Sequence, residues 1–345
     1  MNSKFYSILL LCMLFIGTRL NAQNRKQVRT NVGLTYPLSS NWTNAPRDTN
    51  NFSLNILAGV SAAERRVTIA GLINIIHHNA SGFQIAGFSN YIGQQASGTQ
   101  VAGFSNYIGQ QASGTQVAGF MNIYKGGKGM AIAGFTNLSG GNSSGQISGF
   151  MNKSKDVYSV QLTGFINLAK TVKGMQIAFI NIADTANLQI GIINLSKNGE
   201  KSLGLTIDEN QTTMLTFRSG GKTLYGILGI GYNFKNKKDK YAYEGGIGAH
   251  LLDIRSFRLN AELTGGGLES FKRGDYIKST LRILPAYKIT PTLEIFGGPS
   301  LNFVQTSSED GKSLTKHYLS SWNGNKNKDL YGFYIGYSAG VQLLF

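Results

Sequence analysis

Cysteine is almost absent from this 345-residue chain, since Cys12 is the only one. It lies within an apolar run from Ile8 to Gly17, which follows Lys4 and precedes Ala22. A positive residue, a short apolar run and a small residue at the cut predict a secretory signal peptide over residues 1–22. The mature chain then begins at Gln23 and contains no cysteine, which excludes disulfides and thiolate metal sites.

Long hydrophobic runs are also missing. No stretch after residue 22 approaches the ~18 uninterrupted apolar residues of a transmembrane helix. If the mature protein spans a membrane, it must do so as a closed β-barrel, because only that structure satisfies every backbone polar group in lipid. Proline is rare, at 5 residues, whereas the chain has 44 glycines, 16 tyrosines and 19 phenylalanines. This composition suits twisted strands and aromatic girdles.

Acidic residues are few. The chain has 17 of them against 33 Lys and Arg, which gives a net charge of +16. One interpretation is attraction to anionic partners such as lipopolysaccharide phosphates. The other, which we favour, is a set of solvated loops that keep the chain soluble during transit. No nucleic-acid motif accompanies the charge, so we expect no nucleic-acid partner, and we expect no cofactor.

A tandem repeat with the core Gln-Ile-Ala-Gly-Phe-x-Asn dominates the first half of the mature chain. Its spacing is 16 residues at first, then 15, and 13 at the last step. Within one copy, Val101 and Tyr107 fall on one face, whereas Gln100 and Asn106 fall on the other. This alternation predicts strands rather than helices. Copies begin at Thr68, Gln84, Gln100, Gln116, Ala131, Gln146, Gln161, Gln176 and Gln189.

The repeats resemble a family of bacterial surface-repeat proteins, whose units have the form Gly-x-Gln-Ile-Gly-x-x-Asn. The resemblance covers about residues 66–197 and rests on a short motif in nine copies. It implies a surface or outer-membrane location. It implies no activity and no binding residue.

The second half of the chain has longer strands with one apolar face and one small or polar face, as in a transmembrane barrel. We expect Ile230 and Ile247 to face lipid, and Asn233 and Glu244 to face the lumen. The last strand is amphipathic, contains Tyr337 and ends at Phe345. Such an ending resembles the assembly signal of bacterial outer-membrane barrels, which implies the barrel assembly machinery as a partner. We therefore predict an assembly signal that includes Tyr337 and Phe345.

These patterns predict an all-β fold, an antiparallel transmembrane β-barrel of the outer membrane. The tandem repeats are expected to be barrel strands, in a barrel of roughly eighteen strands with an aqueous channel. The alternative is a parallel β-solenoid of repeats beside a smaller barrel. The predicted segments are a signal peptide (1–22), N-terminal strands and a loop (23–65), repeat strands (66–197) and C-terminal barrel strands (198–345) with an outer loop (305–329).

A catalytic or metal site in this chain would depend on its histidines, but their positions favour structural roles. Adjacent strand residues point to opposite faces, so His77 and His78 cannot chelate a metal from one side. His250 shares the presumed lumen face with Glu244 and Glu262, a pair that a hydrolase could use, although charges also fill barrel lumens.

The sequence therefore predicts a non-enzymatic outer-membrane barrel, exported through the general secretory pathway. It would contact outer-membrane lipid and lipopolysaccharide. Two functions remain open, a passive porin-like pore and a surface-exposed scaffold. The first alternative is an adhesion or display protein with a barrel-anchored solenoid, and the second is an outer-membrane hydrolase.

Overall fold

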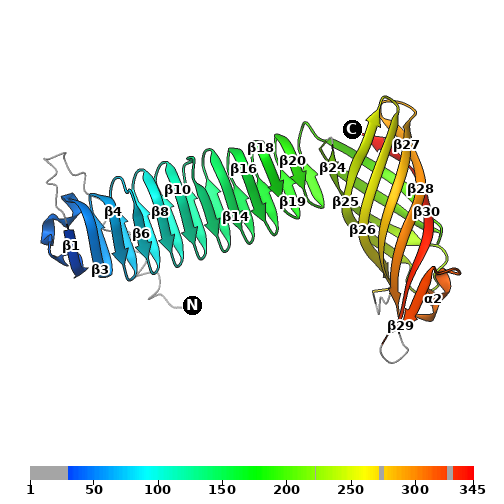
Figure 1. The fold of residues 1–345 in the computed structure, drawn as a ribbon, viewed down its shortest axis with the longest axis horizontal. Coiled ribbons are helices and arrows are strands. Elements are labelled where there is room, and N and C mark those ends of the chain that lie inside the picture. The colour runs from blue at the N-terminus through cyan, green and yellow to red at the C-terminus, as the bar shows by residue number, and fades with distance from the viewer. Residues whose placement is uncertain (1–29, 222, 272–275, 325–328) are drawn as a thin grey trace.

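The computed structural model describes residues 30–221, 223–271, 276–324 and 329–345. The predicted signal peptide lies outside these residues. The described chain is all-β and has two parts, a β-solenoid followed by a β-barrel (Figure 1). The all-β prediction and the antiparallel barrel are confirmed. The arrangement is that of the alternative, in which the repeats form a parallel solenoid beside a smaller barrel.

The solenoid is built from 21 strands among the described residues. Most coils contribute two short strands, and within the stack these strands pair in parallel with their equivalents in the coils before and after them. In sequence order the strands are β1 (Thr30–Thr35), β2 (Leu38–Ser39), β3 (Thr49–Ser61), β4 (Ala63–Ala70), β5 (Ile73–Ile76), β6 (Phe83–Ala86), β7 (Ser89–Ile92), β8 (Ala96–Ala102), β9 (Ser105–Ile108), β10 (Ala112–Ala118), β11 (Met121–Tyr124), β12 (Met130–Ala133), β13 (Thr136–Ser139), β14 (Ser143–Ser148), β15 (Met151–Lys153), β16 (Asp156–Thr163), β17 (Ile166–Leu168), β18 (Thr171–Ile177), β19 (Ile180–Ile182), β20 (Thr185–Ile190) and β21 (Ile193–Leu195).

The repeats are therefore not strands of the barrel wall, and this corrects the first arrangement that we predicted. Each repeat core is two strands rather than one, because the chain turns a corner at Gly103-Phe104 between β8 and β9. A transmembrane strand needs about 9–11 residues, and β9 has only 4. The strands of successive copies are also parallel and in register: Gln100 pairs with Gln84 on one side and with Gln116 on the other.

The corner needs glycine because the coils approach closely there. A Cβ on Gly103 would collide with the carbonyl oxygen of Gly87, the equivalent residue one coil earlier. Gly119 has the same relation to Gly103. Glycine at this corner therefore permits the close approach of successive coils that the hydrogen bonds of the parallel strands impose.

The N-terminal end of the solenoid is covered by β2, which pairs antiparallel with β1, and by a 3₁₀ helix, η1 (Trp42–Arg47). Beneath this cap lies Glu64, which is 2% exposed. Its Oε1 accepts hydrogen bonds from Asn50 Nδ2 at 3.0 Å and Ser53 Oγ at 2.8 Å. Burial raises the pKa of the Glu64 carboxyl above its ordinary 4.5, and the two hydrogen bonds act in the opposite direction.

Replacing Glu64 with glutamine should stabilise the solenoid at neutral pH. A folded-state pKa above the unfolded value contributes stability below the unfolded pKa, and this stability is lost as the pH rises through the folded-state pKa. The glutamine of the Glu64→Gln variant cannot ionise, so the urea midpoint of this variant should exceed that of the native chain at about pH 8, with the gap closing near about pH 4. Trp42 fluorescence in a Trp322→Phe background measures the transition. A gap that widens in acid would contradict this assignment.

The barrel is antiparallel throughout, and β22 pairs with β30 to close it. Among the described residues, eight strands form the closed circuit, rather than roughly eighteen, and β29 pairs with β30 beside it. A short helix, α2 (Glu309–Leu314), precedes β29. The strands are β22 (Glu200–Asp208), β23 (Thr212–Gly220), β24 (Leu224–Asn233), β25 (Tyr241–Ile254), β26 (Phe257–Glu269), β27 (Tyr276–Lys288), β28 (Leu293–Thr306), β29 (Ser320–Asn323) and β30 (Leu330–Leu344).

The barrel wall has an apolar outer face and a polar inner face. Ile230 and Ile247 point outward, with exposed fractions of 66% and 44%, whereas Asn233 is fully buried inside. Glu244 also points inward, where it pairs with Arg282. The predicted faces of these strands are therefore confirmed, and contact with lipid stays a prediction. Separately, no helix among the described residues is long and apolar enough to cross a membrane.

The solenoid ends directly on the outer wall of the barrel, beside β23 and β24. Asn194 in the last coil donates its backbone N–H to Ser219 Oγ at 3.0 Å and its side-chain amide to the Ser219 carbonyl at 3.3 Å. A Cβ on the outward-facing Gly226 would collide with the carbonyls of Gly191 and Ile192. The barrel wall thus covers the last coil, and the solenoid leaves the barrel beside β24 at a steep angle to its strands (Figure 1).

Candidate functional site

The middle of the barrel lumen is occupied by an ion-pair network around Glu262. Arg218 Nε lies 2.7 Å from Glu262 Oε1, and Arg282 Nη1 lies 3.8 Å from Glu262 Oε2. Tyr225 donates its hydroxyl to Glu262 Oε1 at 3.0 Å. Arg282 also pairs with Glu244 and donates to Thr264 Oγ1. These residues come from several strands, so the network links the barrel wall across its interior.

A second network fills the end of the lumen nearest the short turns. Arg258 is 2% exposed and pairs with Glu200 at 2.6 Å and with Asp253 at 2.9 Å. Its Nη1 also lies 3.5 Å from Glu294 Oε2. Gln342 of the last strand donates to Glu294 Oε1 at 2.6 Å, so this network ties β30 to β28.

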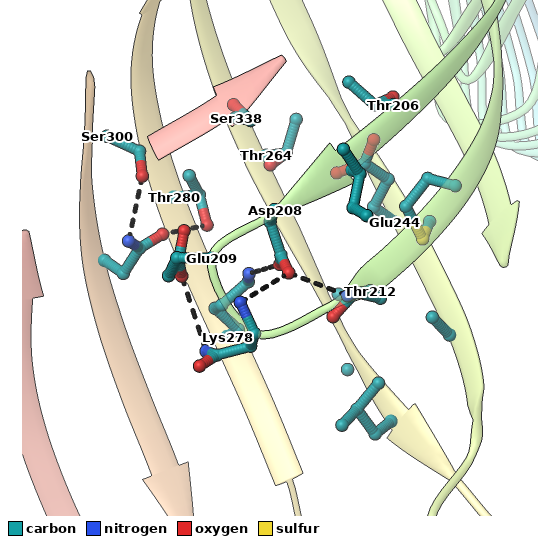
Figure 2. A pocket seen from close by; sticks show the side chains of 18 of the residues that line it. Thr206, Asp208, Glu209, Thr212, Glu244, Thr264, Lys278, Thr280, Ser300 and Ser338 are labelled. Atoms are coloured by element: carbon teal, nitrogen blue, oxygen red, sulfur yellow. Dashed lines mark hydrogen bonds and ion pairs between the residues drawn. The ribbon is translucent and has the colours of Figure 1, made fainter. Parts of the chain in front are cut away.

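The third polar group lies toward the end with the longer connections. Lys278 Nζ and Asp208 Oδ2 are 2.7 Å apart in a cavity of about 60 Å³ (Figure 2). Leu314, the last residue of α2, is 2% exposed and lines the same cavity. Part of the predicted outer loop, residues 305–329, therefore covers this end of the barrel lumen. Lys235 fixes it there by donating to the Leu314 carbonyl at 2.6 Å.

The lumen is therefore packed with side chains. An eight-stranded barrel has an interior just wide enough for its own side chains to fill, and three networks occupy it from end to end. The cavity beside Lys278, at about 60 Å³, has room for only a few waters. The wide aqueous channel expected for a barrel of eighteen strands has no counterpart in the described residues.

The histidines show no catalytic arrangement among the described residues. His250 Nδ1 lies 2.6 Å from Asn260 Oδ1, and its ring packs on Tyr225 at 4.6 Å between centroids. The carboxylate nearest to it in the ion-pair network is Glu200, 3.9 Å from Nε2. Glu244 and Glu262, which share the lumen face with His250 as predicted, pair with arginines instead.

His77 and His78 lie just beyond β5, where their backbone N–H groups donate to Ser61 and Ala62. His77 is exposed and His78 is partly buried. Within the part of the chain that the structure describes, no group of three or more His, Cys, Asp or Glu side chains could hold a metal ion.

The interior of the solenoid contains two ladders of amide side chains, one of asparagines and one of glutamines. Within each ladder, the side chains of successive coils are hydrogen-bonded to one another. Asn74, Asn90 and Asn106 begin a run in which each amide donates to the asparagine of the next coil, with distances of 2.8 to 3.1 Å along the ladder. Each amide is buried. The ladder is a structural feature, because its donors and acceptors are used inside the stack. Its further members are Asn122, Asn137, Asn152, Asn167, Asn181 and Asn194.

The second ladder joins glutamines of successive coils and is interrupted at Ala131. Its members are Gln84, Gln100 and Gln116 before the gap and Gln146, Gln161, Gln176 and Gln189 after it. There Tyr124, which takes the place of an isoleucine in the preceding coils, turns its hydroxyl into the gap. It accepts from Gln146 Nε2 at 3.0 Å and lies 2.9 Å from Ser143 Oγ. The tyrosine thus takes over the acceptor role of the missing glutamine toward Gln146, whereas the buried Gln116 Oε1 on the other side of the gap has no hydrogen-bond donor among the described residues.

Tyr337 and Phe345, the predicted assembly signal, lie on the outer face of β30 and at its end. Their exposed fractions are 65% and 69%. Phe345 exchanges backbone hydrogen bonds with Lys201, at 2.9 and 3.3 Å, and so completes the seam between the last and first barrel strands. Their role in assembly stays a prediction.

The fold thus defines a barrel with a filled lumen and a solenoid fixed to its wall. No family model and no curated protein matches the chain. Two solved structures are similar to part of it: the solution structure of the de novo designed TMB2.3 and the crystal structure of Neisserial surface protein A (NspA). Their identities are 13% and 12%, and each match covers 42% of this chain and 92% or 93% of the other, with TM-scores of 0.22. The barrel assignment rests on the strand pairing and not on these likenesses.

Proposed function

We propose that this protein is a non-enzymatic outer-membrane protein in which a barrel with a filled lumen anchors a β-solenoid scaffold. The observation that carries the proposal is the pair of opposite faces on one barrel: an apolar outer wall and an interior linked by ion pairs. The first suits lipid, and the second fills the space through which solutes would have to pass. Of the two functions that the sequence left open, this supports the scaffold over the pore.

The connections at the barrel ends support an orientation. Outer-membrane barrels have short periplasmic turns and longer extracellular loops. The turn from Ile254 to Phe257 is short, whereas the connection from Thr306 to Leu330 is long. The solenoid joins the wall near the short turns, so we place the solenoid on the periplasmic side and α2 outside, beside lipopolysaccharide. The alternative, a displayed adhesin, needs the opposite orientation.

Cys12 is the only cysteine of the chain and lies within the predicted signal peptide. Variants with one added cysteine in the mature chain can therefore test this orientation. We expect Ser321→Cys, in β29, to react with a membrane-impermeant maleimide on intact cells. Gln110→Cys, on the exposed surface of the solenoid, should react only after the outer membrane is permeabilised. Labelling of Gln110→Cys on intact cells would favour the displayed adhesin.

Planar-bilayer recording of the purified protein tests the filled lumen separately. We expect no steady single-channel current, because the ion pairs of Glu262 and Arg258 cross the interior. Steady conductance steps would support the pore instead.

A further inference from the structure

The solenoid has an aromatic edge along one side. From Phe88 to Phe179 the corner residue of each coil stacks on its equivalent in the next coil, with nearly parallel rings and centroids 4.9 to 6.3 Å apart. These rings are on the outside: Phe88 is 48% exposed and Phe104 is 40% exposed. We use the term aromatic edge for Leu72, Phe88, Phe104, Phe120, Phe135, Phe150, Phe165, Phe179 and Ile192.

The surfaces that flank this edge are largely apolar. On one side an aliphatic column runs through the even-numbered strands, with Ile85, Ile132 and Leu162 each 36% exposed or more. On the other side Tyr91 and Tyr107 stack at 5.0 Å, in a column that is apolar except for the exposed Lys153. A continuous apolar strip of this length is far larger than the scattered hydrophobic residues of an ordinary soluble surface.

The opposite corner of the coils is polar and carries four lysines and one aspartate. Backbone hydrogen bonds from coil to coil align these residues in a column, as in the bond from Lys170 N to Lys155 O at 2.7 Å. We use the term polar edge for His78, Gln94, Gln110, Lys125, Gly141, Lys155, Lys170, Asp184 and Lys197. The solenoid is therefore amphipathic in cross-section along its whole length.

The junction with the barrel fixes which way each edge faces. In the last coil, the polar side lies at the barrel rim, where Lys201 Nζ donates to the Ser196 carbonyl at 2.9 Å. The aromatic edge lies further from the rim: Ile192 packs toward Gly245, which pairs with Leu228 on the exposed apolar wall. The aromatic edge thus points toward the middle of the barrel wall, and the polar edge points away from it.

From this geometry we infer that the solenoid lies along the membrane with its aromatic edge immersed among the acyl chains of the leaflet on the short-turn side. The apolar wall of the barrel and the aromatic edge meet at one level, around Leu228 and Ile247, so one lipid layer contacts both. Lysines of the polar edge remain in water, as on the polar side of an interfacial amphipathic element. This inference rests on the proposed membrane location of the barrel.

Tryptophan quenching by brominated lipid tests the inference on the full-length protein. Trp42 and Trp322 are first replaced by phenylalanine, since they are the two native tryptophans. One reporter is then added: Phe104→Trp on the aromatic edge, or Gln110→Trp on the polar edge of the same coil. A third reporter, Ile230→Trp on the barrel wall, tests the location of the barrel itself.

In vesicles of dibrominated phosphatidylcholine, we expect strong quenching of the Phe104→Trp and Ile230→Trp reporters and little quenching of the Gln110→Trp reporter. Quenching at position 230 but not at 104 would overturn the inference and leave the proposed function intact. If the reporter at 104 were instead shielded from both lipid and aqueous acrylamide, a protein would cover the edge, which also overturns it. Absence of quenching at position 230 would overturn the membrane barrel.

Discussion

Replacing Glu262 with leucine should lower the free energy of unfolding of the barrel by about 3–5 kcal/mol. Glu262 is 1% exposed and lies between two arginines whose side chains are 7% exposed. Removing its charge leaves Arg218 without its carboxylate partner, in a place that water reaches poorly. Removing one member of a buried pair costs this much because the remaining charge is uncompensated. Urea unfolding of the detergent-refolded protein measures the loss, with Trp322 fluorescence in a Trp42→Phe background.

A second substitution separates the loss of an ion pair from a loss of packing. In the Glu262→Leu chain, Arg218→Met removes the uncompensated charge, and we expect it to restore part of the lost stability. Glu309→Gln, an exposed residue of α2 that pairs with Lys312, is the matched control and should leave the urea midpoint unchanged. If Arg218→Met destabilised the chain further, charge compensation would not be the role of Glu262.

The second large effect is expected inside the solenoid, at Asn106. Its Nδ2 donates to Asn122 Oδ1 at 2.9 Å and to the Val117 carbonyl at 2.8 Å, and its Oδ1 accepts from Asn90 at 2.9 Å. Asn106→Leu removes the partner of two buried side-chain groups, on Asn90 and Asn122. Each buried group left without its partner costs about 1–3 kcal/mol, so the solenoid should lose about 2–6 kcal/mol.

The control for this substitution is Gln110→Leu, an identical type of change at an exposed position of the same coil. We expect it to change stability by less than about 0.5 kcal/mol. Trp42 fluorescence in a Trp322→Phe background follows the solenoid in both variants. Equal midpoints for the two leucine variants would show that the asparagine ladder contributes no net stability.

The barrel could be predicted from the sequence to a large extent. Period-2 alternation in its strands correctly assigned Ile247 to the outer face and Glu244 to the lumen, because alternation on a strand is a local property. The ion pair between Arg218 and Glu262 could not be predicted in this way. The two residues are 44 positions apart, and their meeting depends on the tilt and number of strands. The sequence feature that could have indicated buried ion pairs was arginine at inward-facing positions, as at Arg218, Arg258 and Arg282.

The solenoid was harder to predict, because the strands of a parallel solenoid and those of an antiparallel barrel show the same alternation of inward and outward residues. Two local features favour the coil. Gly103-Phe104 interrupts the repeat after four alternating residues, which makes each strand too short to cross a bilayer. Gln100 and Asn106 recur at the same place in successive copies, and buried amides of this kind are satisfied when identical residues stack in parallel.

The residue order alone could not show that the barrel wall covers the last coil. That contact joins Asn194 to Ser219 and needs a glycine, Gly226, at one outward position of β24. Outward glycines are frequent in these strands, so Gly226 carries no distinguishing local pattern. The amphipathic cross-section of the solenoid could not be predicted from alternation either, because it depends on where the chain turns its corners. Phe104 and Gln110 lie on opposite edges only because the chain turns at both of these positions.

Excision of one coil tests most directly whether the repeats are a solenoid attached to a separate barrel. Deleting residues 98–113 joins equivalent positions and lets Gln116 stack on Gln84. In a solenoid each coil contacts only its neighbours, so this variant and the two-coil deletion 82–113 should both give normal amounts of heat-modifiable protein in outer-membrane fractions. If repeats were antiparallel wall strands, losing one would reverse the strands on one side of the cut and prevent closure. Failure of the single excision with success of the double one would contradict the solenoid.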